Sequence, residues 1–294
     1  MQASRVTQQF HRFYDGGAPG EPADRASPPR IVLERHDETG VENFSLSRTL
    51  GYDDRRLGEL LVPARADFRT DLTSVPWLFT WLVPRTGAHL PAALLHDGLV
   101  GSRDAPPSYL SVEGHLVARE EADRVFRDAM ADTGTGVVRR WLVWTAVTIA
   151  TIVVGSRSWG PVRWWGYRLA AAVTIGVVLV LGTLATLDLF DAGVVALPWM
   201  DDRVWWGELL GGFAGAVAIP FLLGLGWGRL RVAGAITGVL LAVLLHVTLV
   251  LLVLTALYQA VEHLSQRAPT VAWTLGGVVV TLSLLTFLGS VWPS

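Results

Sequence analysis

The dipeptide His96-Asp97 lies in an apolar stretch, with Asp71 and Leu72 about 25 residues before it and Asp123 about as far after it. A histidine paired with a carboxylate can take a proton from water, because the carboxylate fixes the imidazole tautomer and stabilises the imidazolium. Carboxylate and carbonyl oxygens are the ligands that hard cations prefer. The spacing therefore predicts a metal-assisted site for ester hydrolysis.

The two members of the dipeptide are expected to have different roles. Consecutive residues on a helix diverge by about 100°, so their side chains can meet different neighbours. We expect His96 to be the catalytic base, with the Asp123 carboxylate as its partner. Asp97 would face the loop that holds Asp71, where two carboxylates and the Leu72 carbonyl oxygen would bind a divalent cation. We expect the bound cation to be Ca²⁺, with another divalent cation as the alternative. No further cofactor is expected.

Each of these residues also has a purely structural interpretation. Asp71 and Ser74 could cap the helix that follows them. His96 could be a core histidine bonded to Asp123 for structure alone. Asp97 is the most informative residue, because a carboxylate on an apolar helix must find a partner or remain exposed.

The elements that must position these residues predict an α+β soluble domain over residues 31–156. A small antiparallel β meander comes first, separated by turn signals at 38–40 and 51–53, and α-helices follow. The predicted strands cover 31–34, 43–50 and 57–62, and the predicted helices cover 74–81, 88–100 and 117–132. Residues 1–30 contain no apolar run and are rich in Gly, Pro, Asp and Arg, which predicts a disordered tail.

Residues 141–154 form a shorter apolar segment. About 14 residues of helix rise only some 21 Å, which is too short to cross a bilayer. We expect a helix that packs on the soluble domain or lies at the membrane interface. An Arg- and Trp-rich interfacial linker is predicted at 157–168.

The remaining residues, 169–294, predict an all-α transmembrane bundle of four helices. Each segment offers about 20 apolar residues, and tryptophans flank the segments. The four predicted spans are 169–187, 209–227, 232–258 and 271–292. The arginine bias of the connecting segments predicts that the soluble domain and both termini lie in the cytoplasm. Gly211 and Gly215 could let helices approach closely, which would allow a homo-oligomer through the transmembrane helices.

Composition narrows the chemistry further. The net charge of -2 gives no reason to expect nucleic acid as a partner, and the 24 basic residues are all arginine. The absence of cysteine excludes disulfides, thiolate zinc sites and a cysteine nucleophile. Histidine and carboxylates must therefore carry any reaction, and membrane phospholipid is the expected partner.

The motifs Thr70-Asp71-Leu72, Ala92 to Asp97 and Ala122-Asp123 together resemble the bacterial and phage domain-of-unknown-function 1353 family, over about residues 31–155. That family name implies no established activity. A looser resemblance is to prokaryotic phospholipase A₂ enzymes, which have a Thr-Asp-Leu calcium loop, a His-Asp catalytic helix and an Asp on the next helix. This resemblance implies that Asp71, Leu72 and Asp97 hold Ca²⁺, that His96 is the base and that Asp123 is its partner.

Three functions follow as hypotheses. The first is a membrane-anchored, cytoplasm-facing, phospholipase A₂-like ester hydrolase. The alternative is a non-catalytic membrane effector or scaffold protein that acts through its transmembrane bundle. A metal-dependent phosphohydrolase of the His-Asp type is a third hypothesis, for which His89 is poorly placed because it lies only seven residues before His96.

Overall fold

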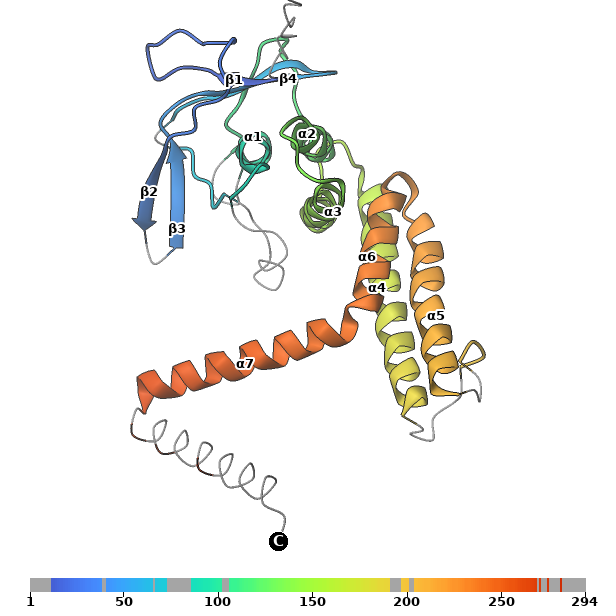
Figure 1. Ribbon diagram of the computed structural model, residues 1–294. Coiled ribbons are helices and arrows are strands. Elements are labelled where there is room, and N and C mark those ends of the chain that lie inside the picture. The colour runs from blue at the N-terminus through green and yellow to red at the C-terminus, as the bar shows by residue number, and fades with distance from the viewer. Residues whose placement is uncertain are drawn as a thin grey trace, which may run out of the picture. The chain divides into compact units, whose positions relative to one another are not determined.

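The computed structural model describes residues 12–38, 41–65, 67–72, 86–101, 106–190, 197–200 and 204–268, with the single positions 270, 274 and 281. The chain divides into two compact units, Met1–Val243 and Leu244–Ser294. The first unit contains all the strands and helices α1 to α6, and the second contains α7 (Figure 1).

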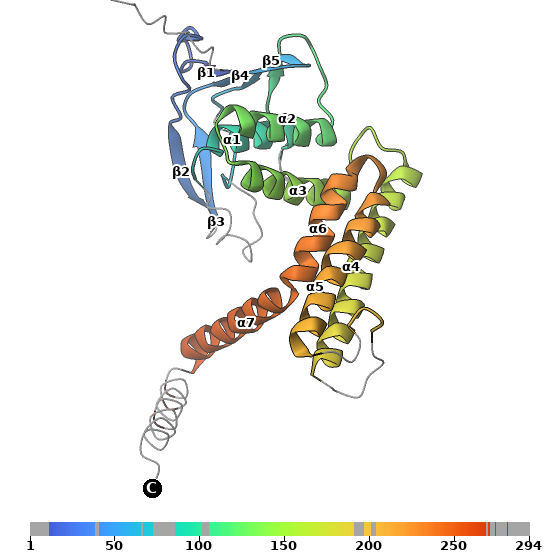
Figure 2. The ribbon, with the colours of Figure 1, turned by 45° about the vertical axis from the view of Figure 1, so that its right-hand side comes forward.

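The strands of the first unit form two antiparallel sheets. One is the hairpin of β2 (Leu33–Glu38) and β3 (Val41–Leu46). The other has the order β1-β4-β5-β6, in which β4 and β5 are joined by a tight turn (Figure 2). Its strands are β1 (Phe13–Asp15), β4 (Leu50–Asp54), β5 (Gly58–Val62) and β6 (Leu110–Ser111).

The predicted three-stranded meander is wrong in its division of residues 43–54. The predicted strand 43–50 spans the end of β3 and the start of β4, and the predicted turn at 51–53 lies inside β4. Tyr52 explains the difference, since it is fully buried, pairs with Leu60 and packs on the Phe13 ring at 4.6 Å between centroids. Burial of the aromatic ring outweighs the turn preference of its Gly and Asp neighbours.

The predicted disordered tail over residues 1–30 is wrong for the part that the structure describes. Phe13 and Tyr14 are buried in β1, which pairs with β4. Arg48 binds the carboxylate of Asp15 at 2.8 Å and so ties the end of this strand to the domain. A strand of three residues is too short to give a periodic signal in the sequence. Residues 1–11 lie outside the described part of the chain.

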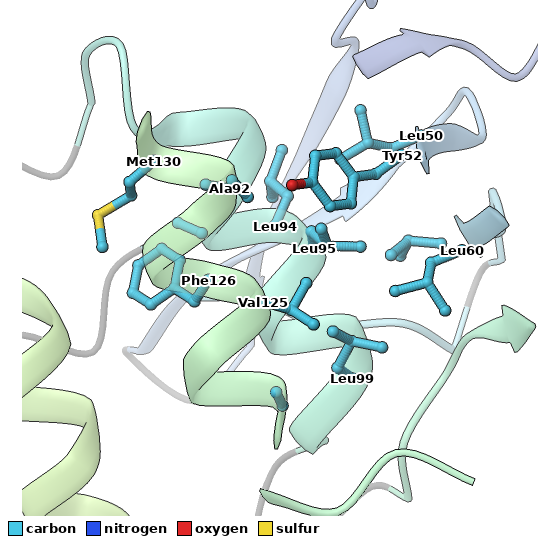
Figure 3. Packing of buried hydrophobic residues seen from close by; sticks show 14 of the residues in the cluster. Leu50, Tyr52, Leu60, Ala92, Leu94, Leu95, Leu99, Val125, Phe126 and Met130 are labelled. Carbon is cyan, nitrogen blue, oxygen red and sulfur yellow. The ribbon is translucent and has the colours of Figure 1, made fainter. Parts of the chain in front are cut away.

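Two helices complete the core of the soluble domain, and both confirm predictions. Helix α1 (Leu90–Val100) and helix α2 (Arg119–Asp132) correspond to the predicted helices 88–100 and 117–132. Gly98 lets α1 approach β5 closely, because an added Cβ there would lie 2.6 Å from a methyl group of Val62. Figure 3 shows the apolar side chains that meet between the helices and the sheet, including Tyr52, Leu60, Leu94, Leu95, Leu99 and Val125. The predicted helix 74–81 lies outside the described residues.

Helix α3 (Val137–Val154) confirms the helix predicted at 141–154 but begins four residues earlier. Val143 and Trp144 belong to the core of the soluble domain, so one face of α3 packs there, as one of the two alternatives predicted. The prediction that this segment is too short to span is wrong, because its 18 residues are long and apolar enough to cross a membrane. The sequence hid the extra turn because Arg139 and Arg140 interrupt the apolar run.

Four helices of the described chain are long and apolar enough to cross a membrane: α3, α4 (Pro161–Leu189), α5 (Trp205–Leu225) and α7 (Leu245–Arg267). Helices α4 and α5 confirm the predicted spans 169–187 and 209–227. Antiparallel sheets followed by such helices confirm the predicted fold class. The predicted span 271–292 lies outside the described residues, except for the helical positions 274 and 281.

The predicted span 232–258 is wrong as a single helix. A short 3₁₀ turn at Gly228–Leu230 leads into α6 (Arg231–Val243), and α7 begins only after Leu244. The ψ angle of Leu244 is 9°, which interrupts the helical hydrogen bonds. Neither proline nor glycine stands at this position, so the usual sequence signals of a helix break are absent.

Candidate functional site

The centre of the site is a buried pair formed by His96 of α1 and Asp123 of α2. The His96 Nε2 atom lies 2.8 Å from the Asp123 Oδ1 atom, and the two residues are 8% and 2% exposed. An ionised carboxylate can only accept hydrogen bonds, so Nε2 carries the proton and the lone pair of neutral His96 lies on Nδ1. The ring of Phe126 stacks on the imidazole at 4.8 Å between centroids and holds its plane.

The neighbouring carboxylate, Asp97, is directed by Thr70 rather than by α2. The Thr70 hydroxyl donates to Asp97 Oδ2 and accepts a hydrogen bond of 2.8 Å from the backbone N–H of Leu72. The other oxygen, Asp97 Oδ1, lies 4.0 Å from His96 Nδ1. The side chains of His96 and Asp97 therefore point to different neighbours, as the sequence predicted. The unprotonated nitrogen of His96 lies on the side of Asp97.

Thr70 is a site residue that the sequence analysis did not assign. It joins the loop that holds Asp71 to helix α1, and its backbone forms two hydrogen bonds of 2.8 and 2.9 Å with Phe44. A threonine whose hydroxyl accepts from the N–H two residues later is a known turn signal. That signal was available in Thr70-Asp71-Leu72, and it would have pointed to a fixed loop.

The backbone of this loop has an unusual conformation at Leu72. Its φ angle is 69°, and no other non-glycine residue in the described ranges has a positive φ. The left-handed region costs an ordinary residue roughly 1–2 kcal/mol. The Leu72 side chain is buried in the domain core, which offsets that cost. Leu72 therefore fixes the loop beside Asp97.

The electrostatics of Asp97 suit a cation or a proton. Burial, together with the negative charge of Asp71, raises the pKa of Asp97 to about 6, although His96 and the Thr70 hydroxyl act in the opposite direction. Two carboxylates that interact in a low-dielectric setting gain from a bound cation. Carboxylate oxygens such as those of Asp97 and Asp71 are the donor type that hard divalent ions prefer. Within the described ranges no group of three or more His, Cys, Asp or Glu side chains is gathered in this way.

A small pocket reaches Asp97 from the surface. Its wall comes from the loop after β5, from the end of α1 and from the segment before β6. The residues around Asp97 include Arg65, Phe68, Arg69, Gly101 and Ser108. Asp123 does not line this pocket, so the two carboxylates next to His96 have different access to solvent.

The histidine considered for the phosphohydrolase hypothesis, His89, is not part of this arrangement. It is fully buried at the residue before α1. Seven residues of helix separate it from His96, which is about 10 Å along the axis. The structure therefore does not bring His89 to the His96–Asp123 pair.

Comparison with known proteins identifies one relationship. Residues 44–147 match the family model described as "Protein of unknown function (DUF1353)". The match runs from β3 into α3 and contains Asp71, Leu72, His96, Asp97 and Asp123, so the predicted resemblance is confirmed for this segment. No curated protein and no solved structure matches the chain.

Proposed function

We propose that the protein is a membrane-anchored hydrolase of phospholipid esters, assisted by a divalent cation, with its soluble domain on the cytoplasmic side of a bacterial inner membrane. The observation that carries this proposal is the buried His96–Asp123 hydrogen bond of 2.8 Å, which leaves Nδ1 of His96 on the side of Asp97. A histidine oriented in this way is equipped to act as a general base.

In the proposed reaction, His96 Nδ1 takes a proton from water as the water oxygen attacks the ester carbonyl. Asp123 stabilises the resulting imidazolium through the Nε2 hydrogen bond. The imidazolium then returns the proton to the departing alcohol oxygen, which yields a fatty acid and a lysophospholipid. A cation held by Asp97, Asp71 and the Leu72 carbonyl oxygen would supply polarisation of the ester carbonyl. Thr70 orients Asp97 for that role.

The arrangement of the apolar helices supports a membrane substrate. Arg168 lies 4.9 Å from the ring centroids of both Trp164 and Trp165 in the first turns of α4. Arginine and tryptophan side chains favour the headgroup level of a bilayer. The cytoplasmic orientation rests on Arg157 before α4, on Arg163 and Arg168 in its first turns, and on the positive-inside rule.

The activity test compares His96→Ala with wild-type protein purified in detergent, on phospholipid micelles with Ca²⁺, Mg²⁺ or Mn²⁺. Loss of a general base lowers turnover by about 10²–10⁴-fold. His115→Ala is the matched control, because His115 is exposed in the segment before α2. Equal cleavage by wild-type protein and His96→Ala, or no cleavage with any of the three cations, would contradict the proposal.

A calorimetric titration with Ca²⁺ tests the cation separately. We expect Asp97→Asn and Asp71→Asn to weaken binding, whereas His115→Ala leaves it unchanged. The non-catalytic alternative makes the opposite prediction, since it needs neither the cation nor the base. Full biological effect in both His96→Ala and Asp97→Asn would favour that alternative.

A further inference from the structure

Two short segments carry positive charge without a carboxylate of their own. Residues 155–168, which lead into α4 and form its first turns, contain three arginines, and residues 226–231, which join α5 to α6, contain two. Neither segment contains Asp or Glu. The positive-inside rule explains on which side of a membrane such arginines stand, but not what their side chains bind. The five residues are Arg157, Arg163, Arg168, Arg229 and Arg231.

A buried aromatic cluster brings the two segments together. Trp227 of the second segment is fully buried and packs with Trp159 and Tyr167 of the first. Its Nε1 atom donates to the Thr174 hydroxyl of α4 at 2.9 Å. Leu230 packs against the same cluster, so the arginines on either side of it lie at the end of the bundle where α4 begins (Figure 2). The five arginines therefore belong to one basic surface, which we call the arginine surface.

Most guanidinium groups of the arginine surface are available to an anion. Arg157, Arg229 and Arg231 are exposed, and within the described ranges none of the three forms an ion pair or a side-chain hydrogen bond. The guanidinium of Arg168 lies 4.9 Å from the centroids of two tryptophan rings, a contact that does not neutralise its charge. Four of the five charges thus have no acidic partner in the described chain.

One carboxylate of the soluble domain acts on the fifth arginine. Glu120, at the start of α2, accepts hydrogen bonds from the hydroxyls of Ser156 and Ser158. Burial would raise the pKa of Glu120, but these hydrogen bonds and the positive charge of Arg163 lower it below its usual value. Five arginines against this one carboxylate leave an excess of four positive charges.

Exposed apolar side chains border the arginines, which favours a lipid over a soluble anion. Val162, Trp165 and Leu169 in the first turns of α4 are all exposed. Val232, directly after Arg231, is exposed as well. A ligand that contacts both kinds of side chain must carry an anionic group next to an apolar one. A phospholipid has this arrangement at its glycerol backbone.

We propose that the arginine surface binds the headgroups of anionic phospholipids in the membrane that α4 and α5 are suited to cross. Basic clusters at the ends of membrane helices attract anionic lipid electrostatically. A zwitterionic headgroup has no net charge to balance the excess on this surface, so the surface should distinguish the two lipid classes. The surface shares no residue with the His96–Asp123 pair or with the proposed cation site. The inference therefore stands apart from the proposed hydrolysis.

Native mass spectrometry of the full-length protein in detergent tests this binding with two probes, dioleoylphosphatidylglycerol and dioleoylphosphatidylcholine. Their acyl chains are identical, so a difference in affinity reports the headgroup charge. We expect the anionic lipid to bind at least about tenfold more tightly. Arg157→Gln and Arg229→Gln should each weaken its binding about fivefold, the ratio that corresponds to about 1 kcal/mol per basic residue. Binding of the zwitterionic lipid should not change.

Two further variants serve as controls. Arg229→Lys keeps the charge, so we expect an affinity within about twofold of wild-type protein. Arg267→Gln removes an exposed arginine at the end of α7, outside the arginine surface, and should leave binding unchanged. Equal binding of the two lipids by wild-type protein would overturn the proposal. Unchanged binding in both Arg157→Gln and Arg229→Gln, or equal weakening in Arg267→Gln, would overturn it as well.

A soluble probe distinguishes a lipid site from a site for a free phosphate ester. Glycerophosphoglycerol is the headgroup of the same anionic lipid without its acyl chains, and calorimetry measures its binding to the same protein. We expect it to bind at least about tenfold more weakly than the lipid, because it loses the apolar contacts. Binding as tight as that of the lipid would overturn the proposal. All these measurements read binding without turnover, so a failed hydrolysis assay does not decide them.

Discussion

Apolar side chains are buried in the soluble domain but exposed on the helices α4 and α5. In the domain, Leu60 and Val62 of β5 have no exposed surface. In α4, Leu169 and Val180 are 66% and 59% exposed, and only 11% of the most apolar window of α4 or α5 is buried. Apolar surface of this extent is stable only in an apolar solvent. The exposed fractions therefore indicate that the domain suits water and that α4 and α5 suit lipid.

The contacts between elements differ in the same way. Large side chains such as Leu94, Leu95 and Leu99 fill the space between helices and sheet in the domain. Helices α5 and α6 instead meet at glycines, where an added Cβ at Gly224 would lie 2.2 Å from the backbone of Ala235. Close backbone contact is the usual way to pack helices in lipid, where burial of apolar groups provides no driving force between helices.

The largest expected effect is a loss of stability when a buried ion pair of the soluble domain is broken. Arg124 of α2 binds the fully buried Asp54 carboxylate at 2.7 Å. Arg124→Met leaves that carboxylate without its cation, which should lower the free energy of unfolding by about 3–5 kcal/mol. Thermal unfolding followed by circular dichroism measures the change. Arg35→Met, which breaks an exposed pair, should cost less than about 1 kcal/mol. Equal effects of the two variants would contradict this reading of the core.

The next effect tests the lipid-facing side of α4. Val180→Arg places a charge on an exposed apolar position, and we expect a cost of about 2.5–3.5 kcal/mol for insertion near the middle of a bilayer. The fraction of protein recovered in membranes measures it. Val112→Arg is the control, because Val112 is equally exposed but follows β6 of the soluble domain. Normal membrane recovery of Val180→Arg would remove the assignment of α4 as a span.

The smallest effect concerns pH and Asp97. Since the pKa of this carboxyl is raised from 3.8 to about 6, the folded state favours its protonated form. The protonated Asp97 side chain therefore contributes to the free energy of unfolding. This contribution is fully present below about pH 4 and is lost as pH rises through about 6, a change of up to about 3 kcal/mol. The difference in unfolding temperature between wild-type protein and Asp97→Asn should therefore vary across this window. Parallel curves for the two proteins would contradict the raised pKa.

Much of the site could be predicted from the sequence because its geometry follows from helical periodicity. The divergence of His96 and Asp97 and the approach of Asp123 required only two helices of the right phase. The role of Thr70 depends on a hydrogen bond across 27 residues, which periodicity does not encode. The pocket beside Asp97 was missed for a similar reason, since its lining residues Arg69 and Ser108 are brought together by the packing of loops.

The errors in the fold have physical causes of the same kind. Phe13 and Tyr14 were assigned to a tail because two aromatic residues do not form a pattern, although their partners in β4 make them a strand. The break at Leu244 carries no glycine or proline. The extra turn of α3 was hidden by arginines at its start. For β1, the pairing with β4 rather than local preference determines the element.

Strand β1 has a consequence for any shortened form of the protein. The ring of Tyr14 covers Gly51 so closely that an added Cβ on Gly51 would lie 2.2 Å from it. A chain that began at residue 31 would lack this cover and would present the unpaired backbone of β4 to solvent. Exposed strand edges recruit other strands, so such a fragment should aggregate even with every site residue intact. The short N-terminal strand thus protects solubility as well as the fold.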